Sequence, residues 1–391
     1  MTGRVLRVLT RPNVGGPTRQ AVALWHAQRA LGWRTLLVTG RCRDGEPSVD
    51  LGAAGVPRVE LDQALVPGGA AQGWVELPEL QRQPHPARDR RAARRLVALL
   101  HAWGPDVVHT HTSKAGWLGR AAARRAAVPV VAHTYHGHVL ADYYPGVVSA
   151  VLRRLEARAA ARTDLLFAVS PTCRRELIDM GIGGARLRVV PPAIEYARFA
   201  GGDRVAARRA LRVAEDALVL GFVGRLVRIK RPDLFADVVA AVPGGVGVAF
   251  GDGPLHAGLA GGGGRVHWLG VGVDLPGCLG GLDVLVMPSE REGCPLAAVE
   301  AMAAGVPVVG FDVPGVRDVL GEWGRGVLVP RGEGAAGLAR AVRALAAEPE
   351  RRRSLIAAGQ RGLARFAPTA VAAALCDAYR QALAERHAQV L

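Results

Sequence analysis

The stretch Ser289–Gly310, SEREGCPLAAVEAMAAGVPVVG, holds two glutamates, Glu292 and Glu300, eight positions apart. Eight residues make slightly more than two turns of an α-helix. The apolar run 284–287 before them is typical of a buried strand, residues 296–304 are typical of a helix, and 305–309 of a stop and a further strand. This order predicts Glu292 in a loop before a helix and Glu300 about two turns further on, so that their carboxylates can contact different parts of one extended ligand.

Four short motifs in this stretch resemble a known family. Pro-Ser stands at 288–289, Glu-Gly-x-Pro-Leu at 292–296, Glu-Ala-Met-Ala at 300–303 and Gly-x-Pro-Val-Val at 305–309. Together they resemble the paired-glutamate region of the retaining glycosyltransferases of family 4 (glycosyltransferase group 1), especially members that act in polysaccharide biosynthesis. The resemblance implies a GT-B fold and transfer of a sugar from a nucleoside diphosphate; the alternative is a solvated acidic helix face.

The 391 residues, half of them hydrophobic, are enough for two domains. Apolar runs alternate with helical segments, which predicts an α/β protein with two doubly wound, Rossmann-like domains. We predict an N-terminal domain at 1–195, a nucleotide-sugar domain at 196–366 and a terminal helix at 367–391, which the resemblance returns to the first domain. Residues 41–91 show too little periodicity for a prediction. The predicted strands are 5–9, 35–38, 106–109, 128–132, 165–169 and 187–190, then 217–223, 246–250, 266–269, 284–287, 306–310 and 327–329.

Composition limits the compartment and the partners. The first residues lack the pattern of a secretory signal, no run of eighteen apolar residues occurs, and the five cysteines show no paired spacing. We therefore expect a cytoplasmic protein. The formal charge of +16 suits phosphorylated ligands, anionic lipid or nucleic acid, but aromatic residues make up only 5% and do not alternate with the arginines. Nucleic acid is therefore not an expected partner.

In the first domain, two sites follow predicted strands. Gly15 and Gly16 stand between a strand and a helix, where a glycine pair and free helix amides suit a phosphate, although the pair could equally be a structural turn. Pro17 stands where the family more usually has a small residue. Histidines cluster at 109–111 and 133–138 without clear metal-ligand spacing, so no metal is expected. The resemblance places His136 against the transferred sugar, and His109 is expected to be a satisfied strand residue.

In the second domain, Arg225 and Lys230 follow the first strand, and Lys230 is one of only two lysines in the chain. A departing diphosphate needs such cations, although lone basic residues are usually solvated. The resemblance gives Arg225 and Lys230 this role, with Glu300 on the ribose and Glu292 on sugar hydroxyls. The remaining donor-binding residues that it implies are Gly16 from the first domain, Gly253, Val271 at the nucleobase, and the amides of Cys294, Leu296 and Ala297.

The predicted function is retaining transfer of a sugar, first of all from a UDP-sugar, to a glycan or lipid-linked glycan in the cleft between the domains. No Asp-x-Asp occurs, so the reaction is expected to need neither metal nor cofactor. A soluble natural-product acceptor, a UDP-sugar 2-epimerase and a nonenzymatic sugar-nucleotide-binding protein remain alternatives. Arginines on the predicted helices of the first domain could also hold it at the inner face of an anionic membrane, or could simply be solvated.

Overall fold

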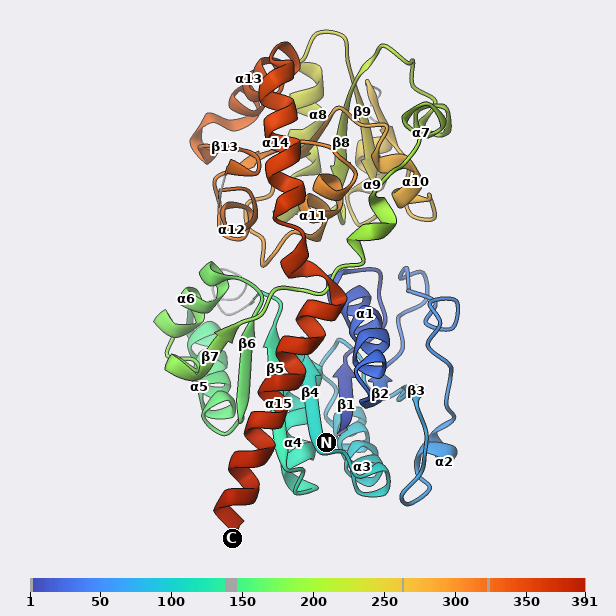
Figure 1. Ribbon diagram of the computed structural model, residues 1–391, viewed down its shortest axis with the longest axis vertical. Helices are drawn as coiled ribbons and strands as arrows, with labels where there is room; N and C mark the ends of the chain where they lie inside the picture. Colours follow the sequence, from blue (N-terminus) through green and yellow to red (C-terminus); the bar gives the residue numbers. More distant parts are fainter. Residues whose placement is uncertain (1–2, 138–145, 262–263, 322–323, 391) are drawn as a thin grey trace. The chain divides into compact units, whose positions relative to one another are not determined.

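The computed structural model describes residues 3–137, 146–261, 264–321 and 324–390, and the chain forms two compact units (Figure 1). Unit 1 comprises Met1–Ala193 together with Pro368–Leu391, and unit 2 comprises Ile194–Ala367. Unit 1 is therefore made of two separate pieces of sequence, whereas unit 2 is continuous.

Unit 1 is built around a parallel seven-stranded sheet with the strand order β3-β2-β1-β4-β5-β6-β7. Its strands are β1 (Arg4–Leu9), β2 (Arg34–Thr39), β3 (Gly73–Glu76), β4 (Val107–His111), β5 (Val130–Tyr135), β6 (Leu165–Ala168) and β7 (Leu187–Val189). Its helices are α1 (Gly16–Ala30), α2 (Leu61–Ala64), α3 (Pro86–Trp103), α4 (Ser113–Arg125), α5 (Gly146–Ala161), α6 (Pro171–Asp179) and α15 (Pro368–Val390).

The two faces of this sheet pack against different helices, because successive side chains of a strand point to opposite sides. Val5 and Val107 lie in one apolar cluster with Leu24 of α1 and Leu375 of α15. Their neighbours Leu6 and Val108 lie in another cluster, with residues of α3 and α4. Helix α15 lies beside α1 (Figure 1), and the two helices together cover one face of the unit 1 sheet.

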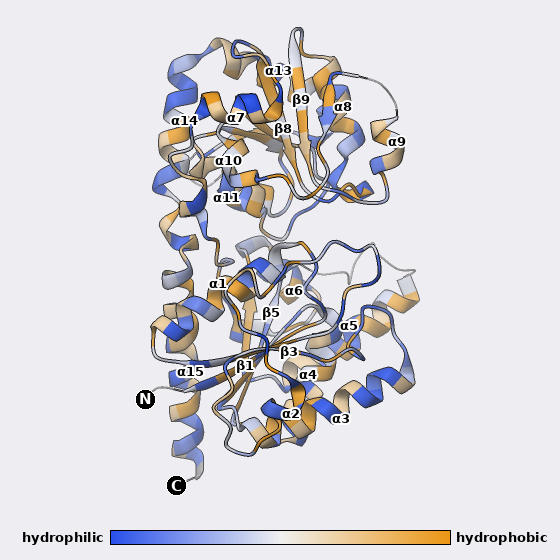
Figure 2. Cartoon of the chain, turned by 90° about the vertical axis from the view of Figure 1, so that its right-hand side faces the viewer, coloured by the Kyte–Doolittle hydropathy of each residue, from blue (hydrophilic) through white to orange (hydrophobic). Residues whose placement is uncertain are grey.

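Unit 2 repeats the plan with a parallel six-stranded sheet of order β10-β9-β8-β11-β12-β13 around a single large core. In Figure 2 the central strands β8 and β9 are largely hydrophobic, as expected for strands covered on both faces. Its strands are β8 (Leu218–Val223), β9 (Gly245–Phe250), β10 (Val266–Trp268), β11 (Val284–Met287), β12 (Val308–Phe311) and β13 (Val327–Val329). Its helices are α7 (Arg204–Leu211), α8 (Pro232–Ala240), α9 (His256–Ala260), α10 (Leu275–Leu279), α11 (Leu296–Ala303), α12 (Val316–Leu320), α13 (Gly334–Ala347) and α14 (Pro349–Arg361).

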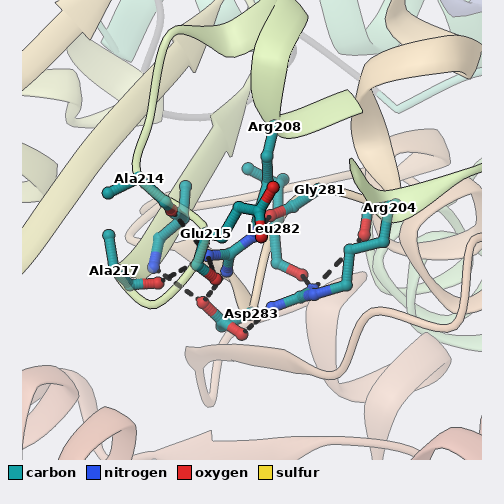
Figure 3. Close-up of polar contacts among 10 residues, drawn as sticks. Arg204, Arg208, Ala214, Glu215, Ala217, Gly281, Leu282 and Asp283 are labelled. Atoms are coloured by element: carbon teal, nitrogen blue, oxygen red, sulfur yellow. Dashed lines mark hydrogen bonds and ion pairs between the residues drawn. The ribbon is translucent and has the colours of Figure 1, made fainter. Parts of the chain in front are cut away.

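A buried arginine ties the start of this sheet together (Figure 3). The guanidinium of Arg208, on α7, donates to the carbonyls of Ala214 at 2.9 Å and Ala217 at 3.0 Å and to Asp283 Oδ2 at 2.7 Å. Asp283 Oδ2 also accepts from the amide of Val219 at 2.8 Å. Arg208 thus joins the turn before β8 to the residue before β11, at the edge of the sheet where these strands begin.

The predicted strands agree with the structure except at their ends and in one region. β4 runs on to His111 and β5 to Tyr135, so more of the histidine-rich segments is strand than we predicted. The region 41–91, left without a prediction, contains α2, the edge strand β3 and the start of α3. Among the helices of the described residues, none has the length and hydropathy needed to cross a membrane.

Candidate functional site

In unit 2 the sequence-predicted residues gather where β8 and β11 end. These two strands are neighbours, and the chain leaves them toward opposite sides of the sheet, β8 leading to β9 and β11 to β12. Such a point leaves a crevice beyond the carboxyl ends of the strands, which is where doubly wound sheets bind ligands. The loop after β8 carries Arg225 and Lys230, and the loop after β11 carries Glu292.

Lys230 and Glu292 form an ion pair across this edge. The ammonium of Lys230 donates to Glu292 Oε1, and the Ser289 hydroxyl donates to the same oxygen at 2.8 Å. The Glu292 side chain is 8% exposed and that of Lys230 is 27% exposed, so the pair is shielded but within reach of solvent. Both residues are thus held in place while the cation can still meet a ligand.

The backbone at Glu292 is fixed from the other side by the turn after β12. The amide of Glu292 donates to the Pro314 carbonyl at 3.1 Å. Gly315 has φ 77°, and a Cβ there would lie 2.3 Å from the Glu292 carbonyl oxygen, so only glycine fits. The carboxylate of Glu292 therefore has a rigid support, which a binding group needs.

Glu300 lies in α11, as the spacing predicts, and is 1% exposed. The helix begins at Leu296 after Pro295, with no side-chain cap and no acidic residue in its first turn among the described residues. Cys294, Leu296 and Ala297 are partly buried around this start. The N-terminal end of α11 therefore offers backbone amides and the positive end of the helix dipole, two features that suit an anion.

The turns after β8 and β9 are held against each other. The amide of Leu226 donates to the Asp252 carbonyl at 3.0 Å, and a Cβ on Gly253 would lie 2.6 Å from the Leu226 carbonyl oxygen. Gly253 is thus required by this close contact. Arg225 beside it is exposed and, within the described residues, has no ion-pair partner, while Val271 after β10 is 46% exposed.

In unit 1 the predicted residues lie at the carboxyl ends of β1, β4 and β5. Gly15 caps α1, which begins at Gly16 and has no acidic residue in its first turn. His111 ends β4 and His136 follows β5, and the structure brings them together with His111 Nδ1 at 2.9 Å from His136 Nε2. His109 is buried and lies within hydrogen-bonding distance of Thr134 and Tyr379, which agrees with its predicted role as a satisfied strand residue.

His136 is neutral at physiological pH. Burial and the nearby Arg7 guanidinium lower its pKa from 6.5 to about 4. Burial likewise lowers the pKa of His109, His111 and His133 well below the usual value. Among the described residues, no group of three or more His, Cys, Asp or Glu side chains is arranged to hold a metal ion.

Three residues of these sites, Arg7, Ser289 and Thr112, have no role assigned to them from the sequence, although Ser289 belongs to the Pro-Ser motif. Arg7 lies in the middle of β1, and Thr112 has φ 62°, a strained conformation for a β-branched residue that often marks a functional site. Thr112 Oγ1 is held 2.7 Å from Thr10 Oγ1. One feature of the sequence pointed to the cluster around Arg7: His109 and His111 stand two positions apart in a strand and so share one face of the sheet.

Comparison with known families divides the chain near the boundary of the two units. The family described as "Glycosyltransferase Family 4" matches residues 14–198, and the family described as "Glycosyl transferases group 1" matches residues 203–362.

Relatives with known names are similar over about two thirds of the chain. A D-inositol 3-phosphate glycosyltransferase of Geodermatophilus obscurus is 37% identical over 66% of this chain and 62% of its own length. One from Kribbella flavida is 33% identical over 68% of each. The UDP-Gal:alpha-D-GlcNAc-diphosphoundecaprenol alpha-1,3-galactosyltransferase of Escherichia coli is 33% identical over 61% of this chain and 66% of its own length. The match thus spans less than two thirds of the first and third of these proteins.

Solved structures share the fold across almost the whole chain. Sucrose-phosphate synthase (tll1590) from Thermosynechococcus elongatus has a TM-score of 0.79 at 22% identity, covering 98% of this chain and 100% of that one. Anabaena Alr3699/HepE, in complex with UDP and glucose, has a TM-score of 0.77 at 18% identity, covering 97% and 100%. From its two Rossmann-like units, the two family matches and the relative from Kribbella flavida, this chain belongs to the family 4 (group 1) glycosyltransferases and has the GT-B fold.

Proposed function

We propose that this chain is a glycosyltransferase that takes a sugar from a nucleoside diphosphate, with UDP as the first candidate nucleotide, and transfers it with retention of the anomeric configuration. The observation that carries the proposal is the edge of unit 2, where Lys230, the supported carboxylate of Glu292 and the start of α11 lie together. A cation beside the amides of a helix start suits a diphosphate, and carboxylates suit the hydroxyls of ribose and sugar.

Each residue has a definite role in this proposal. Glu300 accepts hydrogen bonds from the ribose, and Glu292 accepts them from hydroxyls of the transferred sugar. Arg225 and Lys230 stabilise the negative charge that develops on the departing diphosphate, assisted by the amides of Cys294, Leu296 and Ala297. Gly253 and Val271 contribute backbone around the nucleotide, and Gly15, Gly16 and His136 are proposed as the substrate-contacting residues of unit 1.

The proposed mechanism depends on whether a carboxylate nucleophile can be assigned. Retention by double displacement requires a carboxylate nucleophile beside the anomeric carbon, and we assign none. We therefore propose a front-face reaction in which a donor phosphate oxygen helps to remove the proton of the acceptor hydroxyl. Charge stabilisation falls to protein cations, so no metal is assigned a role.

Binding and transfer measurements test this function. Thermal unfolding with UDP, GDP, ADP and their sugars should show stabilisation by UDP, about 2.7 kcal/mol at a hundred times its dissociation constant. Incubation with a UDP-sugar and acceptor should give a product whose anomeric configuration, read by NMR, matches the donor. Epimerised donor without transfer would favour a 2-epimerase, and binding without turnover would favour a nonenzymatic binding protein.

For the acceptor we propose a polyprenyl-diphosphate-linked sugar at an anionic membrane. The helix α5 carries an exposed apolar stripe of Val147, Val148, Val151 and Leu155, with Arg154 and Arg158 exposed on the same helix. Apolar side chains at this spacing form one face, and basic residues beside such a face bind anionic lipid. The Escherichia coli relative is named for a diphosphoundecaprenol acceptor.

Vesicle binding separates this acceptor class from a soluble one. The wild-type chain should sediment with phosphatidylglycerol vesicles at low salt and be released at high salt. Val151→Glu should weaken binding, whereas Val205→Glu, at another exposed valine near arginines but on α7 of unit 2, should not. No vesicle binding at low salt, with efficient transfer to an inositol phosphate or another soluble acceptor, would replace the lipid-linked acceptor with a small molecule.

A further inference from the structure

A cluster of polar side chains lies on the α1 and α15 face of the unit 1 sheet. Arg7 of β1 is 3% exposed, and His109 and His111 of β4 are fully buried. The period of two in a strand places Arg7 on the same face as Val5, and His109 and His111 on the same face as Val107. A cation and two imidazoles are thus enclosed together, so their hydrogen bonds must all be consistent.

The donors and acceptors of this cluster fix the proton positions. Arg7 Nη2 lies 2.6 Å from Gln28 Oε1, and Arg7 Nη1 lies 2.8 Å from His111 Nε2. A guanidinium can only donate, so His111 Nε2 must accept and the proton of neutral His111 must be on Nδ1. His111 Nδ1 then donates to His136 Nε2 at 2.9 Å. His136 in turn carries its own proton on Nδ1.

His109 takes the opposite tautomer beside the same cation. Arg7 Nη1 lies 3.4 Å from His109 Nδ1, which favours a lone pair there, and the Tyr379 hydroxyl donates to that nitrogen. His109 Nε2 then donates to Thr134 Oγ1 at 2.7 Å. The rings of His109 and His111 are stacked with centroids 4.5 Å apart, so two adjacent imidazoles carry their protons on different nitrogens.

The outer end of this chain of hydrogen bonds remains available to a ligand. His136 is partly buried, and within the described residues its Nδ1 has no hydrogen-bond partner. The titratable and charged groups around it are Arg7 from β1 and His109 and His111 from β4, with His133 of β5 on the opposite face of the sheet. Burial of the ring and the Arg7 guanidinium disfavour a second proton on His136, so the neutral ring can donate a hydrogen bond from Nδ1.

We propose that Arg7 and His111 are positioning residues that hold His136 as its Nδ1–H tautomer and so present a fixed donor to an oxygen of the bound sugar. The identity of that ligand rests on the proposed function, whereas the tautomers do not. Arg7 and His111 act only through His136.

Nitrogen-15 NMR of histidine-labelled protein tests the tautomers directly. In the wild-type chain His111 and His136 should be protonated on Nδ1 and His109 on Nε2 at pH 7. His111→Ala should release His136 from a single tautomer. His111→Asn, whose amide can donate from near the position of Nδ1, should preserve it. An Nε2–H or doubly protonated His136 in the wild-type chain, or an unchanged tautomer in His111→Ala, would overturn the proposal.

Kinetics then test the consequence for transfer. His111→Ala should lower kcat about tenfold, the loss expected for one misplaced hydrogen bond, and should add little to His136→Ala in the double variant. Arg7→Met should move the acidic limb of the pH profile upward, because the His136 pKa rises without the cation, whereas Arg7→Lys should largely restore it. His133→Asn is the matched control: this buried histidine of β5 bonds to Thr110 on the opposite face and should leave the His136 tautomer and the pH profile unchanged.

The outcomes keep this inference separate from the proposed function. The expected tautomers without any sugar transfer would leave the positioning intact and refute the glycosyltransferase proposal. Sugar transfer with the wrong His136 tautomer, or with full kcat in His111→Ala, would refute the positioning alone.

Discussion

At the scale of single residues, the two glutamates of unit 2 differ in burial and therefore in expected effect. Glu300→Ala should weaken UDP binding itself, because it removes the buried carboxylate that we propose as the ribose acceptor, whereas Glu292→Ala should act more on turnover than on UDP affinity. Isothermal titration with UDP measures the first effect and steady-state kinetics the second. Glu290→Gln is the control, because Glu290 lies in the same loop but pairs with Arg231 and Arg331. Unchanged UDP affinity in Glu300→Ala would contradict the ribose assignment.

Arg225 and Lys230 should matter most as the diphosphate departs. We expect Arg225→Ala and Lys230→Ala each to lower kcat/KM, mainly through kcat. The fall should correspond to a loss of several kcal/mol of transition-state stabilisation. Because Lys230 is paired with Glu292, its removal also leaves a shielded carboxylate without its partner. Steady-state kinetics at saturating acceptor measure both variants. A variant that keeps more than about a tenth of wild-type kcat/KM, a loss below about 1.4 kcal/mol, would place that cation outside direct contact with the diphosphate.

At the scale of elements, Arg208 is expected to be a large contributor to the stability of unit 2. Arg208→Met removes a buried guanidinium that donates to Asp283 and to several carbonyls, which costs about 3–5 kcal/mol. Arg204→Met is the matched control, because Arg204 binds the same aspartate at 2.6 Å but its side chain is 47% exposed, so the loss should stay below about 1 kcal/mol. Urea unfolding of both variants gives the two values. Equal losses would show that burial does not set the strength of this network.

Some helices and strands of this fold could be predicted from the sequence, and others could not. The loop and helix that hold Glu292 and Glu300 were predicted because strand, loop, helix and strand follow one another within one continuous stretch. The strand β3 was not predicted, because Gly73–Glu76 is only four residues long and its placement depends on pairing with β2. The cluster of Arg7, Gln28 and Tyr379 joins β1, α1 and α15, and no local pattern reveals a contact between opposite ends of the chain. The donor-site assignments themselves remain predictions.

At the scale of the whole molecule, the buried histidines make the stability of unit 1 depend on pH. Their folded-state pKa values are lowered, so below about pH 6.5 the unfolded chain binds more protons than the native one. This stability is fully present above the unfolded pKa and is lost as pH falls toward about 4, the folded value for His136. Each histidine contributes a slope of up to about 1.4 kcal/mol per pH unit.

Urea unfolding between pH 7 and 5, followed by tryptophan fluorescence, measures this slope. Five of the seven tryptophans lie in the unit 1 segment of the sequence, so the signal reports mainly on unit 1. The free energy of unfolding should fall with acidification, and His133→Asn should flatten the slope by removing one of the buried groups. A free energy that stays constant between pH 7 and 5 would show that these rings take up protons equally in the native and unfolded states, so that folding does not lower their pKa values.

The return of α15 to unit 1 governs the order in which the chain matures on the ribosome. Unit 2 is continuous and complete once Ala367 has left the exit tunnel, whereas unit 1 still lacks Val371, Leu375 and Tyr379 from its core. During synthesis, at about 5–20 residues per second, the first half of the chain must therefore wait, partly unpacked, while the second half folds. Residues 1–367, held on the ribosome by a C-terminal linker long enough to span the exit tunnel, should resist protease in unit 2 and be cut in unit 1, the reverse of the usual order from the N-terminus.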